Sequence, residues 1–571
     1  MRKGIPVVST AVLFTILQSC RSSSASDPIA TDAASISSGK DLFTLNCSGC
    51  HNFTQDGIGP QLRGLTGQVT VGWLRNFIRD PQQVITSGDA RAQELHNKYP
   101  AGMPPFQFLK DEDINHIIAF IHSQGAGNRQ AADDKALQNP IPESIKPSGL
   151  VVGLQVVTQI PSSSSDGRPP AARITKLGFQ PASNYLFVVD LRGKLYRLQN
   201  NSATVYMDMT KLRPKFISEP GLATGFGSFA FHPDFVKNGI LYTTHTESAG
   251  SGKADFAYED SIKVTLQWVL TEWKTNDPTA STFMGTGREL MRINMVTGIH
   301  GVQEIAFNPL ARKGEADYGL LYIGVGDGGA VENGHQSLAH SKEKVWGSIL
   351  RIDPAGKNSA NGQYGIPSGN PFSHDPDPHA LKEIYAYGFR NPHRFSWSKD
   401  GKMISCNIGQ ANIESLYFVE PGHDYGWPMR EGSFVLNPYG DLTKVYPAMP
   451  NDSVYGISYP VAEYDHDEGK AISGGFEYSG TLAALKGRYL FGDIPTGRLF
   501  YVDMNELKEG KQATIHEWDL SVDGKPATLK ALCGNDRIDL HFGKDAKGEL
   551  YVLTKADGKI YKLASAKMQS E

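Results

Sequence analysis

Cysteine is scarce in this chain, which has five in 571 residues. Two of them form a C-x-x-C motif in "LNCSGCHNF", at Cys47 and Cys50, while Cys406 and Cys533 are isolated and far away. A structural zinc site would need a second C-x-x-C or a pair of histidines at ligand spacing, and the motif has neither beside it. The spacing leaves open whether Cys406 and Cys533 pair in an oxidising compartment.

Long basic runs and apolar runs of membrane length are also absent. The 56 Lys and Arg residues nearly balance the 60 Asp and Glu residues, which argues against nucleic acid as a partner. The apolar run "GIPVVSTAVLFTIL" follows Arg2 and Lys3, is too short to span a bilayer and has the length of a signal-peptide core. We therefore predict that the protein is exported from the cytoplasm.

The end of this apolar run, "LQSC", resembles the bacterial lipoprotein lipobox. The resemblance implies a signal peptide over residues 1–20, lipidation of Cys20 and anchoring to a bacterial membrane, on the periplasmic side or at the cell surface. The alternative is an ordinary signal cleaved nearby, after the "SSSAS" run, with no lipid on the cysteine. Residues 21–38 are small and polar, which predicts a flexible tether.

The histidine directly after the second cysteine favours a haem motif over a redox dithiol. Covalent haem attachment needs two thiols about one helical turn apart, which add to the vinyl groups, and an adjacent imidazole that reaches the iron. A thioredoxin-type dithiol would lie in a βαβ pattern, and none surrounds this motif. We therefore predict that Cys47 and Cys50 bind haem c covalently and that His51 is an iron ligand.

The segments after the motif have a helical pattern interrupted by Gly- and Pro-rich loops. "IGPQLRGLTG" supplies a Gly-Pro loop, "VGWLRNFIRDP" predicts a helix, and "LKDEDINHIIAFIHS" places four isoleucines on one helical face behind an acidic first turn. "AGMPPF" puts Met103 in a Pro-rich loop, where its thioether can reach the other side of the iron. Together these segments resemble a small class I cytochrome c domain over residues 39–124. His96 is a rival iron ligand, and Met103 could instead serve only in packing.

Beyond a linker at residues 125–148, the pattern changes to short strands separated by turns. "YLFVVDLRGKLYRL", "YLFGDIPTGRLFYV" and "LYVLTKADGKIYKL" each contain an apolar strand, a Gly-containing turn and an alternating strand, which indicates a β-hairpin. "GILYTTHTE" and "GLLYIGVGDGG" repeat the first half of this unit. Recurring hairpins with almost no amphipathic helix predict a mainly β fold, and a propeller over residues 149–565 in preference to a sandwich or barrel.

Several motifs in this region keep the order found in one family. They are "SFAFHPDF", "HGVQEIAFNP", "LYIGVGDGG", "GSILRIDP", "YGFRNPHRFSW", "DYGWP", "ISGGFEYSG" and "GRYLFGDIPTGRLF". Together they resemble the glucose/sorbosone dehydrogenase family. The resemblance implies a six-bladed propeller and, as in many members, pyrroloquinoline quinone (PQQ) and calcium as cofactors for the oxidation of an aldose or a related sugar or alcohol.

The resemblance also implies roles for individual residues. Oxidation of an aldose removes a proton from the C1 hydroxyl and a hydride from C1, so the site needs a base and an electron sink. His300 in "TGIHGVQEIAF" matches the family's catalytic base, with a strand-capping histidine as the alternative. Arg390 and Asn391 in "YGFRNPHRF" match the pair that faces the quinone, and Arg537 matches a further cofactor-side arginine.

Two calcium sites are implied in the same way. The main-chain carbonyls of Gly409 and Gln410 in "NIGQANIESL" match the loop that holds calcium against PQQ. Glu414, with the carbonyl of Tyr425, matches a second and structural calcium site. Calcium prefers oxygen ligands and tolerates irregular shells, so carbonyl-rich loops suit it.

Three positions depart from the family's pattern. Ala223 stands near a polar glutamine of the family, Ile299 replaces an acidic residue before the base, and Pro495 or Thr496 replaces a lysine, although Lys470 lies close by in sequence. The segment "GKAISGGFEYSG" also resembles hedgehog-interacting proteins, whose propeller is a binding domain.

Two functions are therefore open. The first is a PQQ-dependent dehydrogenase that passes electrons to the fused haem and on to a respiratory acceptor. The second is a propeller without PQQ that binds carbohydrate or protein beside an electron-transfer cytochrome. The fused haem favours the enzyme, because a tethered acceptor has a high effective concentration at a reduced cofactor and a binding module has no use for an electron exit.

Overall fold

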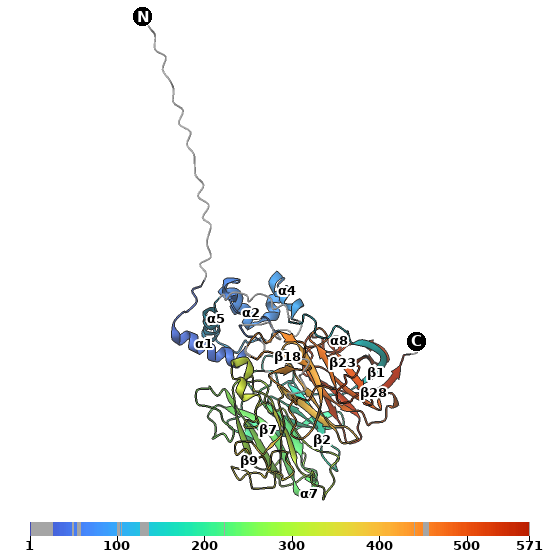
Figure 1. The fold of residues 1–571 in the computed structure, drawn as a ribbon. Coiled ribbons are helices and arrows are strands. Elements are labelled where there is room, and N and C mark those ends of the chain that lie inside the picture. The colour runs from blue at the N-terminus through green and yellow to red at the C-terminus, as the bar shows by residue number, and fades with distance from the viewer. Residues whose placement is uncertain are drawn as a thin grey trace.

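The computed structural model describes residue 1 and residues 27–47, 51–53, 59–99, 103, 105–125, 136–221, 223–438, 440–448 and 456–569. The predicted signal peptide, with Cys20, and the second haem thiol, Cys50, lie outside the described residues. The chain is mainly β, and a group of N-terminal helices lies on one face of a propeller (Figure 1).

The described residues of the N-terminal domain form five α-helices. They are α1 (Ala33–Asn46), α2 (Val71–Arg79), α3 (Pro81–Thr86), α4 (Ala90–Lys98) and α5 (Asp111–Ser123). Thr70, Asp80 and Asp89 cap α2, α3 and α4 by accepting a backbone N–H of the first turn. The helix predicted in "VGWLRNFIRDP" is therefore confirmed, with its start fixed by a local cap.

The first helix begins inside the predicted tether. The Asp32 side chain accepts the backbone N–H of Ser35 at 2.9 Å and thereby caps the N-terminus of α1. The residues that follow Asp32 are small and polar, so their pattern did not indicate a helix. The tether therefore ends at Asp32 rather than at residue 38.

Helices α1 and α5 cross at close range. A Cβ on Gly39 would lie 1.8 Å from the His116 carbonyl oxygen, so only glycine permits this approach. The isoleucines predicted on one face of α5 are all buried, at Ile114, Ile117, Ile118 and Ile121. The core of this small domain thus follows from the helical pattern of its sequence.

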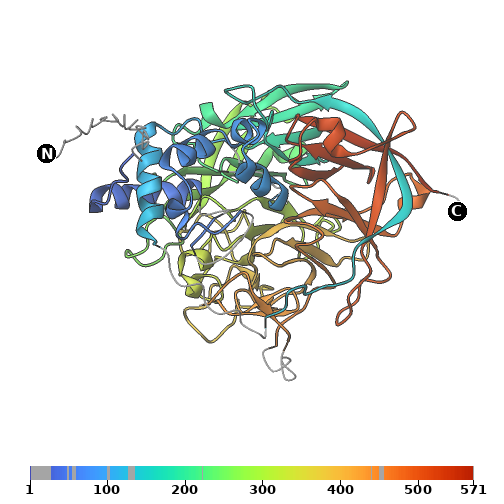
Figure 2. The same ribbon diagram turned by 90° about the horizontal axis from the view of Figure 1, so that it is seen from above.

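The described part of the propeller contains six four-stranded blades arranged around an axis (Figure 2), three of which are joined by strand pairing into one larger sheet. Their strands are β2 (Ile174–Phe179), β3 (Leu186–Asp190), β4 (Lys194–Gln199) and β5 (Ser202–Asp208); β6 (Phe226–Phe231), β7 (Ile240–Ser248), β8 (Leu266–Thr275) and β9 (Gly285–Met295); β10 (Glu304–Phe307), β11 (Leu321–Val325), β12 (Ser348–Ile352) and β13 (Ile384–Tyr387); β14 (Pro392–Trp397), β15 (Met403–Asn407), β16 (Ile413–Val419) and β20 (Ala462–Asp465); β21 (Ile472–Glu477), β22 (Arg488–Asp493), β23 (Leu499–Asp503) and β24 (His516–Val522); and β26 (Leu540–Lys544), β27 (Leu550–Thr554), β28 (Lys559–Met568) and β1 (Lys146–Gln159). The predicted six-bladed propeller is confirmed.

Several short strands and helices lie outside the six blades. They are β17 (Arg430–Glu431), β18 (Phe434–Leu436), β19 (Val445–Tyr446), β25 (Lys525–Ala527), α6 (Met209–Leu212), α7 (Phe235–Asn238) and α8 (Leu529–Cys533). The three predicted hairpins are confirmed as the antiparallel pairs β3–β4, β22–β23 and β27–β28. Cys406 in β15 and Cys533 in α8 are both free thiols, so they do not pair.

The strand β1 closes the ring. It pairs antiparallel with β28, the last strand of the chain, and parallel with β24 of the preceding sheet. The predicted linker therefore ends at Lys146, and its described part already runs along the propeller, where the Leu137 N–H donates to the Val445 carbonyl and the Ile141 N–H to Asp465.

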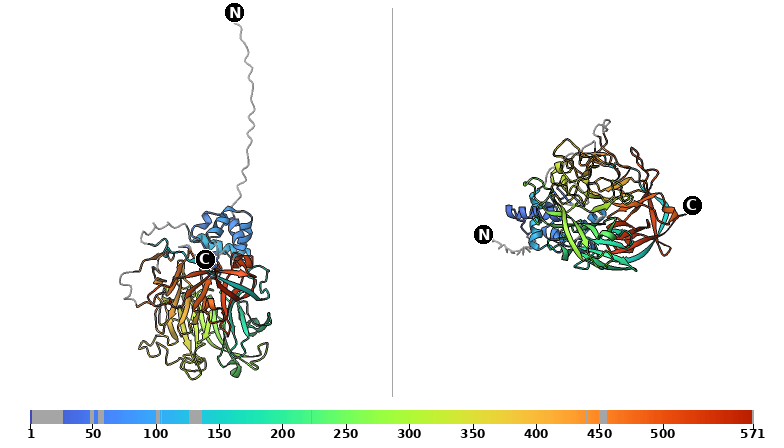
Figure 3. Two further views of the ribbon diagram at one scale, coloured as in Figure 1. Left: turned by 90° about the vertical axis from the view of Figure 1, so that its right-hand side faces the viewer. Right: turned by 90° about the horizontal axis from the view of Figure 1, so that it is seen from below.

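The first strand of each sheet lies nearest the axis. β2, β6, β10, β14, β21 and β26 contact one another in turn and complete a ring. The helical domain covers one end of this ring, as two further views show (Figure 3). None of the helices formed by the described residues is long and apolar enough to cross a membrane.

Candidate active site

A single cavity of about 620 Å³ lies between the helical domain and the propeller axis. The helical domain contributes Cys47, His51 and Met103 to its lining. The propeller contributes residues at the starts of its innermost strands, namely Arg173 before β2, Ala223 before β6, His300 before β10, Arg390 and Asn391 before β14, Ala471 before β21 and Arg537 before β26. Because these strands all begin at the covered end of the ring, the topology gathers residues that are far apart in the sequence.

The haem motif is organised for iron ligation. The ring nitrogen Nδ1 of His51 lies 2.8 Å from the Pro60 carbonyl oxygen, which can only accept, so Nδ1 carries the proton and the lone pair is on Nε2. A Cβ on Gly59 would lie 2.4 Å from the His51 ring, so the Gly-Pro loop can reach this position only with glycine. The Cys47 thiol is buried beside the cavity. These residues fit a haem c.

Both candidates for the second iron ligand line the cavity. Met103 is half-buried and packs against the core of the helical domain. His96 lies at the end of α4, where its Nε2 is 3.6 Å from a carboxylate oxygen of Asp536 in the propeller. This contact gives His96 a role at the domain interface that does not require the iron, and Met103 remains the predicted ligand.

His300 is held by an aspartate that the sequence motifs did not single out. Its Nδ1 lies 2.7 Å from Oδ1 of Asp327, which follows β11 and is fully buried. The other oxygen of Asp327 accepts the indole N–H of Trp427 at 3.0 Å. Burial alone would raise the pKa of Asp327, but attraction to His300 and Arg390 outweighs it and keeps the pKa below its ordinary value.

This arrangement suits His300 to act as a base. The carboxylate fixes the proton on Nδ1, so Nε2 is the basic nitrogen, and it has no hydrogen-bond partner among the described residues. The backbone of His300 has φ of 49°, in the left-handed region that residues other than glycine rarely adopt. The position of Asp327 directly after a buried strand in "GVGDGG" was the signal that could have identified it.

Arg390 is fixed by three acceptors at the edge of the cavity. Its Nε donates to the Gln410 side chain at 2.9 Å, its Nη1 to the Gly409 carbonyl at 2.6 Å, and its Nη2 pairs with the Glu332 carboxylate. Its guanidinium also lies over the Trp427 ring, 5.7 Å from the ring centre. The neighbouring Asn391 is buried and lines the cavity, as predicted for a cofactor contact.

The predicted cofactor-side calcium loop makes different contacts. The Gly409 carbonyl accepts from the Arg390 guanidinium, so a cation bound to it would lie beside a positive charge. The backbone N–H groups of residues 410–413 all donate to one oxygen of Glu431, at 2.7–3.0 Å. Gly409 and Gln410 lie outside the lining of the cavity. The residues of this loop therefore do not fit a calcium ion.

The predicted structural calcium site has the same difficulty. One oxygen of Glu414 accepts from the Gly409 N–H and contacts the His466 ring at 3.0 Å, and the other accepts the Ile472 N–H. Burial raises the pKa of this carboxyl to about 8. The ring of Tyr425 stacks on Phe389, with ring centres 4.3 Å apart, while the prediction concerns its carbonyl. The contacts of Glu414 do not form a calcium shell, and the Tyr425 carbonyl stays a predicted ligand.

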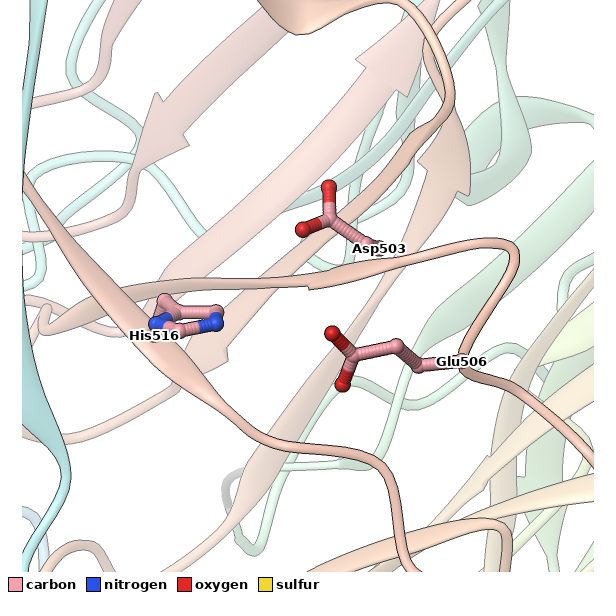
Figure 4. Close-up of side chains that lie close together, drawn as sticks. All are labelled: Asp503, Glu506 and His516. Carbon is pink, nitrogen blue, oxygen red and sulfur yellow. The ribbon is translucent and has the colours of Figure 1, made fainter.

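One group of three possible metal ligands occurs among the described residues, and it lies elsewhere. Asp503, Glu506 and His516 lie at the end of β23 and the start of β24, with ligand atoms within 4.8 Å of one another (Figure 4). Arg488 already pairs with Asp503 at 3.3 Å. None of the three lines the cavity, so the group is separate from the candidate active site.

Cationic side chains dominate the propeller side of the cavity. Arg173, Arg390, Arg537 and Lys555 line it, and all but the half-buried Arg537 are buried. PQQ carries three carboxylates on a planar quinone, so this donor set fits its charge. Arg537, predicted as a cofactor-side arginine, lies on the propeller side of the cavity.

The three departures from the family pattern also line the cavity. Ala223, Ile299 and Pro495 give it apolar surface where the family resemblance implies polar groups. Lys470 does not compensate, because its Nζ donates to the His466 carbonyl at 2.5 Å and it lies outside the cavity lining. On the propeller side of the cavity, the lysine in the lining is Lys555.

Comparison with known proteins divides the chain into the same two parts. Residues 175–562 match the family model described as "Glucose / Sorbosone dehydrogenase", and residues 36–125 match that of cytochrome c. The HIPL2 protein of Arabidopsis thaliana is 27% identical over 55% of this chain and 48% of its own length, and quinoprotein glucose dehydrogenase B of Acinetobacter calcoaceticus is 20% identical over 54% of this chain and 62% of its own length. This chain spans about half the length of the curated relatives it matches first. The soluble aldose sugar dehydrogenase of Escherichia coli, in its apo-form, has a similar fold, with a TM-score of 0.50 and 18% identity over 73% of this chain and all of its own.

Proposed function

Because this chain belongs to the glucose/sorbosone dehydrogenase family and carries a cytochrome c domain, we propose that it oxidises an aldose or a related sugar or alcohol with PQQ and passes the electrons to its own haem c. The observation that carries the proposal is the shared cavity. Residues of the haem motif and residues of the propeller site line one continuous space, so an electron donor and its acceptor would be held next to each other.

The residues of the propeller have distinct roles in this reaction. His300 takes the proton of the substrate hydroxyl on Nε2, and Asp327 stabilises the imidazolium that forms. Arg390, fixed by its three acceptors, places positive charge where negative charge develops on the cofactor. PQQ, when bound, supplies the sink for the hydride from C1. Since the loop of Gly409 and Gln410 does not fit the ion, no step relies on calcium.

The proposal extends to where the protein works. The signal-like segment and the "LQSC" sequence favour export and a lipid anchor, and the haem would pass electrons to a downstream acceptor near a membrane. A second function, a propeller that binds carbohydrate or protein without PQQ, is favoured by one observation, namely the apolar cavity surface at Ala223, Ile299 and Pro495.

The test is to load the haem-containing protein with PQQ, with and without calcium, add aldoses, and follow the reduced haem band. We expect sugar-dependent haem reduction. His300→Ala should abolish it and leave haem content intact, whereas His232→Ala, in a half-buried histidine outside the cavity lining, should not. Haem-containing protein that binds no PQQ and reduces no haem across a broad panel of sugars would favour the binding module, whereas protein that binds PQQ but reduces no haem would refute electron transfer to the haem.

A further inference from the structure

Two buried histidines at the propeller axis have no hydrogen-bond partners among the described residues. His393 in β14 and His541 in β26 are 5% and 1% exposed, and none of their four ring nitrogens is paired. Their ring centres lie 5.6 Å apart, and both residues line the cavity. Buried polar groups are almost always paired, so four unpaired nitrogens on two residues that line one cavity indicate a ligand that supplies missing partners.

A buried lysine stands beside the two rings. Lys555 follows β27, is 7% exposed and lines the same cavity. Its Nζ makes no hydrogen bond or ion pair with any described residue. The nearest acidic group that acts on it is Asp539, whose carboxylate is already paired with the Arg537 guanidinium at 2.9 Å. The ammonium is therefore available to a ligand in the cavity.

The charged groups around the two imidazole rings favour a ligand with negative charge. Burial lowers the pKa of both histidines well below the usual value, and the charged groups that lower it further are Arg394 and Lys555. A metal cation would enter a cationic environment with two imidazoles as its only ligands, because the carboxylate of Asp539 is taken. An anion would gain from the same charges.

We propose that His393, His541 and Lys555 form a binding site for a carboxylate group at the inner end of the cavity. A carboxylate is acceptor-only and has two oxygens, so it can accept from the lysine ammonium and from an N–H of each ring at once. The site deepens the proposed function and rests on it for its ligands, because the group belongs either to PQQ or to an acidic sugar substrate. Lys555 takes no part in the His300–Asp327 pair, so it is a specificity residue for a bound ligand.

Binding to the PQQ-free, haem-loaded full chain tests the proposal. Calorimetric titrations use PQQ, glucuronate and, as the neutral counterpart of glucuronate, glucose. Lys555→Met should weaken the binding of a carboxylate ligand by about tenfold or more, and Lys555→Arg should retain most of it. Lys544→Met is the matched control, since Lys544 lies in β26 over the Phe476 ring and outside the cavity lining. If Lys555→Met does not fold, His541→Asn provides the same test.

The outcomes separate the two sources and the two proposals. Loss of PQQ affinity in Lys555→Met, but not in Lys544→Met, assigns the site to the cofactor. Loss confined to glucuronate assigns it to an acidic substrate. Wild-type binding of glucuronate without binding of PQQ would keep the site and refute the PQQ enzyme. Unchanged affinity for both ligands in Lys555→Met, or no binding of either by the wild type, would overturn the site.

Discussion

At the scale of single residues, the indole of Trp427 joins the two halves of the candidate active site. Its N–H donates to Asp327, and its ring lies under the Arg390 guanidinium. Trp427→Phe keeps an aromatic ring but removes the five-membered half of the indole with its N–H, which leaves one oxygen of a fully buried carboxylate without its donor. A hydrogen bond to a buried charged group contributes about 1.5–3 kcal/mol, so we expect kcat to fall about tenfold or more with little change in KM.

Trp346→Phe is the matched control for this prediction. Trp346 is equally buried and donates its N–H at the same distance of 3.0 Å, but its acceptor is the Asn294 carbonyl and not the Asp327 carboxylate. Steady-state rates with PQQ-loaded protein measure the effect. Equal losses in the two variants would show that Trp427 supports the fold rather than the position of Asp327.

The two isolated cysteines give a second prediction at this scale. Burial raises the pKa of both Cys406 and Cys533 to about 12, and Cys406 is fully buried in β15. Only about one thiol in ten thousand is a thiolate at pH 8 when its pKa is 12, so alkylation is expected to be slow. Cys533, which is half-buried, should react first, and Cys406 only after unfolding.

Mass spectrometry of haem-loaded protein purified from residue 27 onward measures this directly. Cys47 and Cys50 are then bonded to haem, so unfolding in denaturant should reveal two thiols and no more. A mass that shows no free thiol after unfolding would mean that Cys406 and Cys533 are joined, against the structure.

At the scale of elements, one carboxylate organises the loop that holds Arg390. Glu431 in β17 accepts four backbone N–H groups from residues 410–413 on one oxygen and the Asn412 amide on the other. Glu431→Gln turns one acceptor into a donor that faces the Asn412 amide or the loop N–H groups. We expect a loss of about 2 kcal/mol or more in stability, faster hydrogen exchange at residues 410–413 and a lower kcat through Arg390.

Glu477→Gln provides the comparison for this loop. Glu477 is also a buried glutamate, but it accepts a single backbone N–H, from Lys399, in a different sheet. Its variant should lower the melting temperature without faster exchange at residues 410–413. If hydrogen exchange at residues 410–413 is unchanged in Glu431→Gln, Glu431 does not organise this loop.

The sequence could predict some of the helices and strands of this molecule but not how its separate parts come together. Hairpins such as β3–β4 and the buried face of α5 depend on residues close together in the chain, so periodicity and turn residues were enough to predict them. His300, Arg390 and Arg537 were found because motifs preserve their local context. The pairing of His300 with Asp327 depends on how β10 and β11 pair across a long loop, and the approach of His393 to His541 depends on how separate sheets meet at the axis. No local pattern contains that information.

The loop that was predicted to hold calcium does not fit the ion, for a related reason. The order of residues in "NIGQANIESL" matches a calcium loop, but the direction of its carbonyl and N–H groups is set by two partners outside the motif, Arg390 and Glu431. The sequence of the loop alone does not show that its groups would contact Arg390 and Glu431. A motif therefore located the loop but not its chemistry.

At the scale of the whole molecule, the helical domain is held over the cavity by ion pairs. Asp80 pairs with Arg168 and Asp41 with Lys263, each at 2.5 Å, and His96 lies 3.6 Å from Asp536. Most of these side chains are partly exposed, so each pair contributes little and is screened by salt. The position of the haem domain over the propeller should therefore depend on ionic strength.

Arg168→Glu tests this dependence, because it places a carboxylate against the nearly buried Asp80. We expect haem reduction by PQQ-loaded protein to slow about tenfold, while reduction of a small dye acceptor is unchanged or faster, because the covered cavity opens. High salt should slow haem reduction in the wild type and have little further effect in the variant. Lys313→Glu is the control: it reverses an exposed lysine paired with Asp234 near α7, at the end of the propeller opposite the helical domain (Figure 1). If the two variants slow haem reduction equally, or if both acceptors lose rate together, electrons do not leave through the domain that covers the cavity.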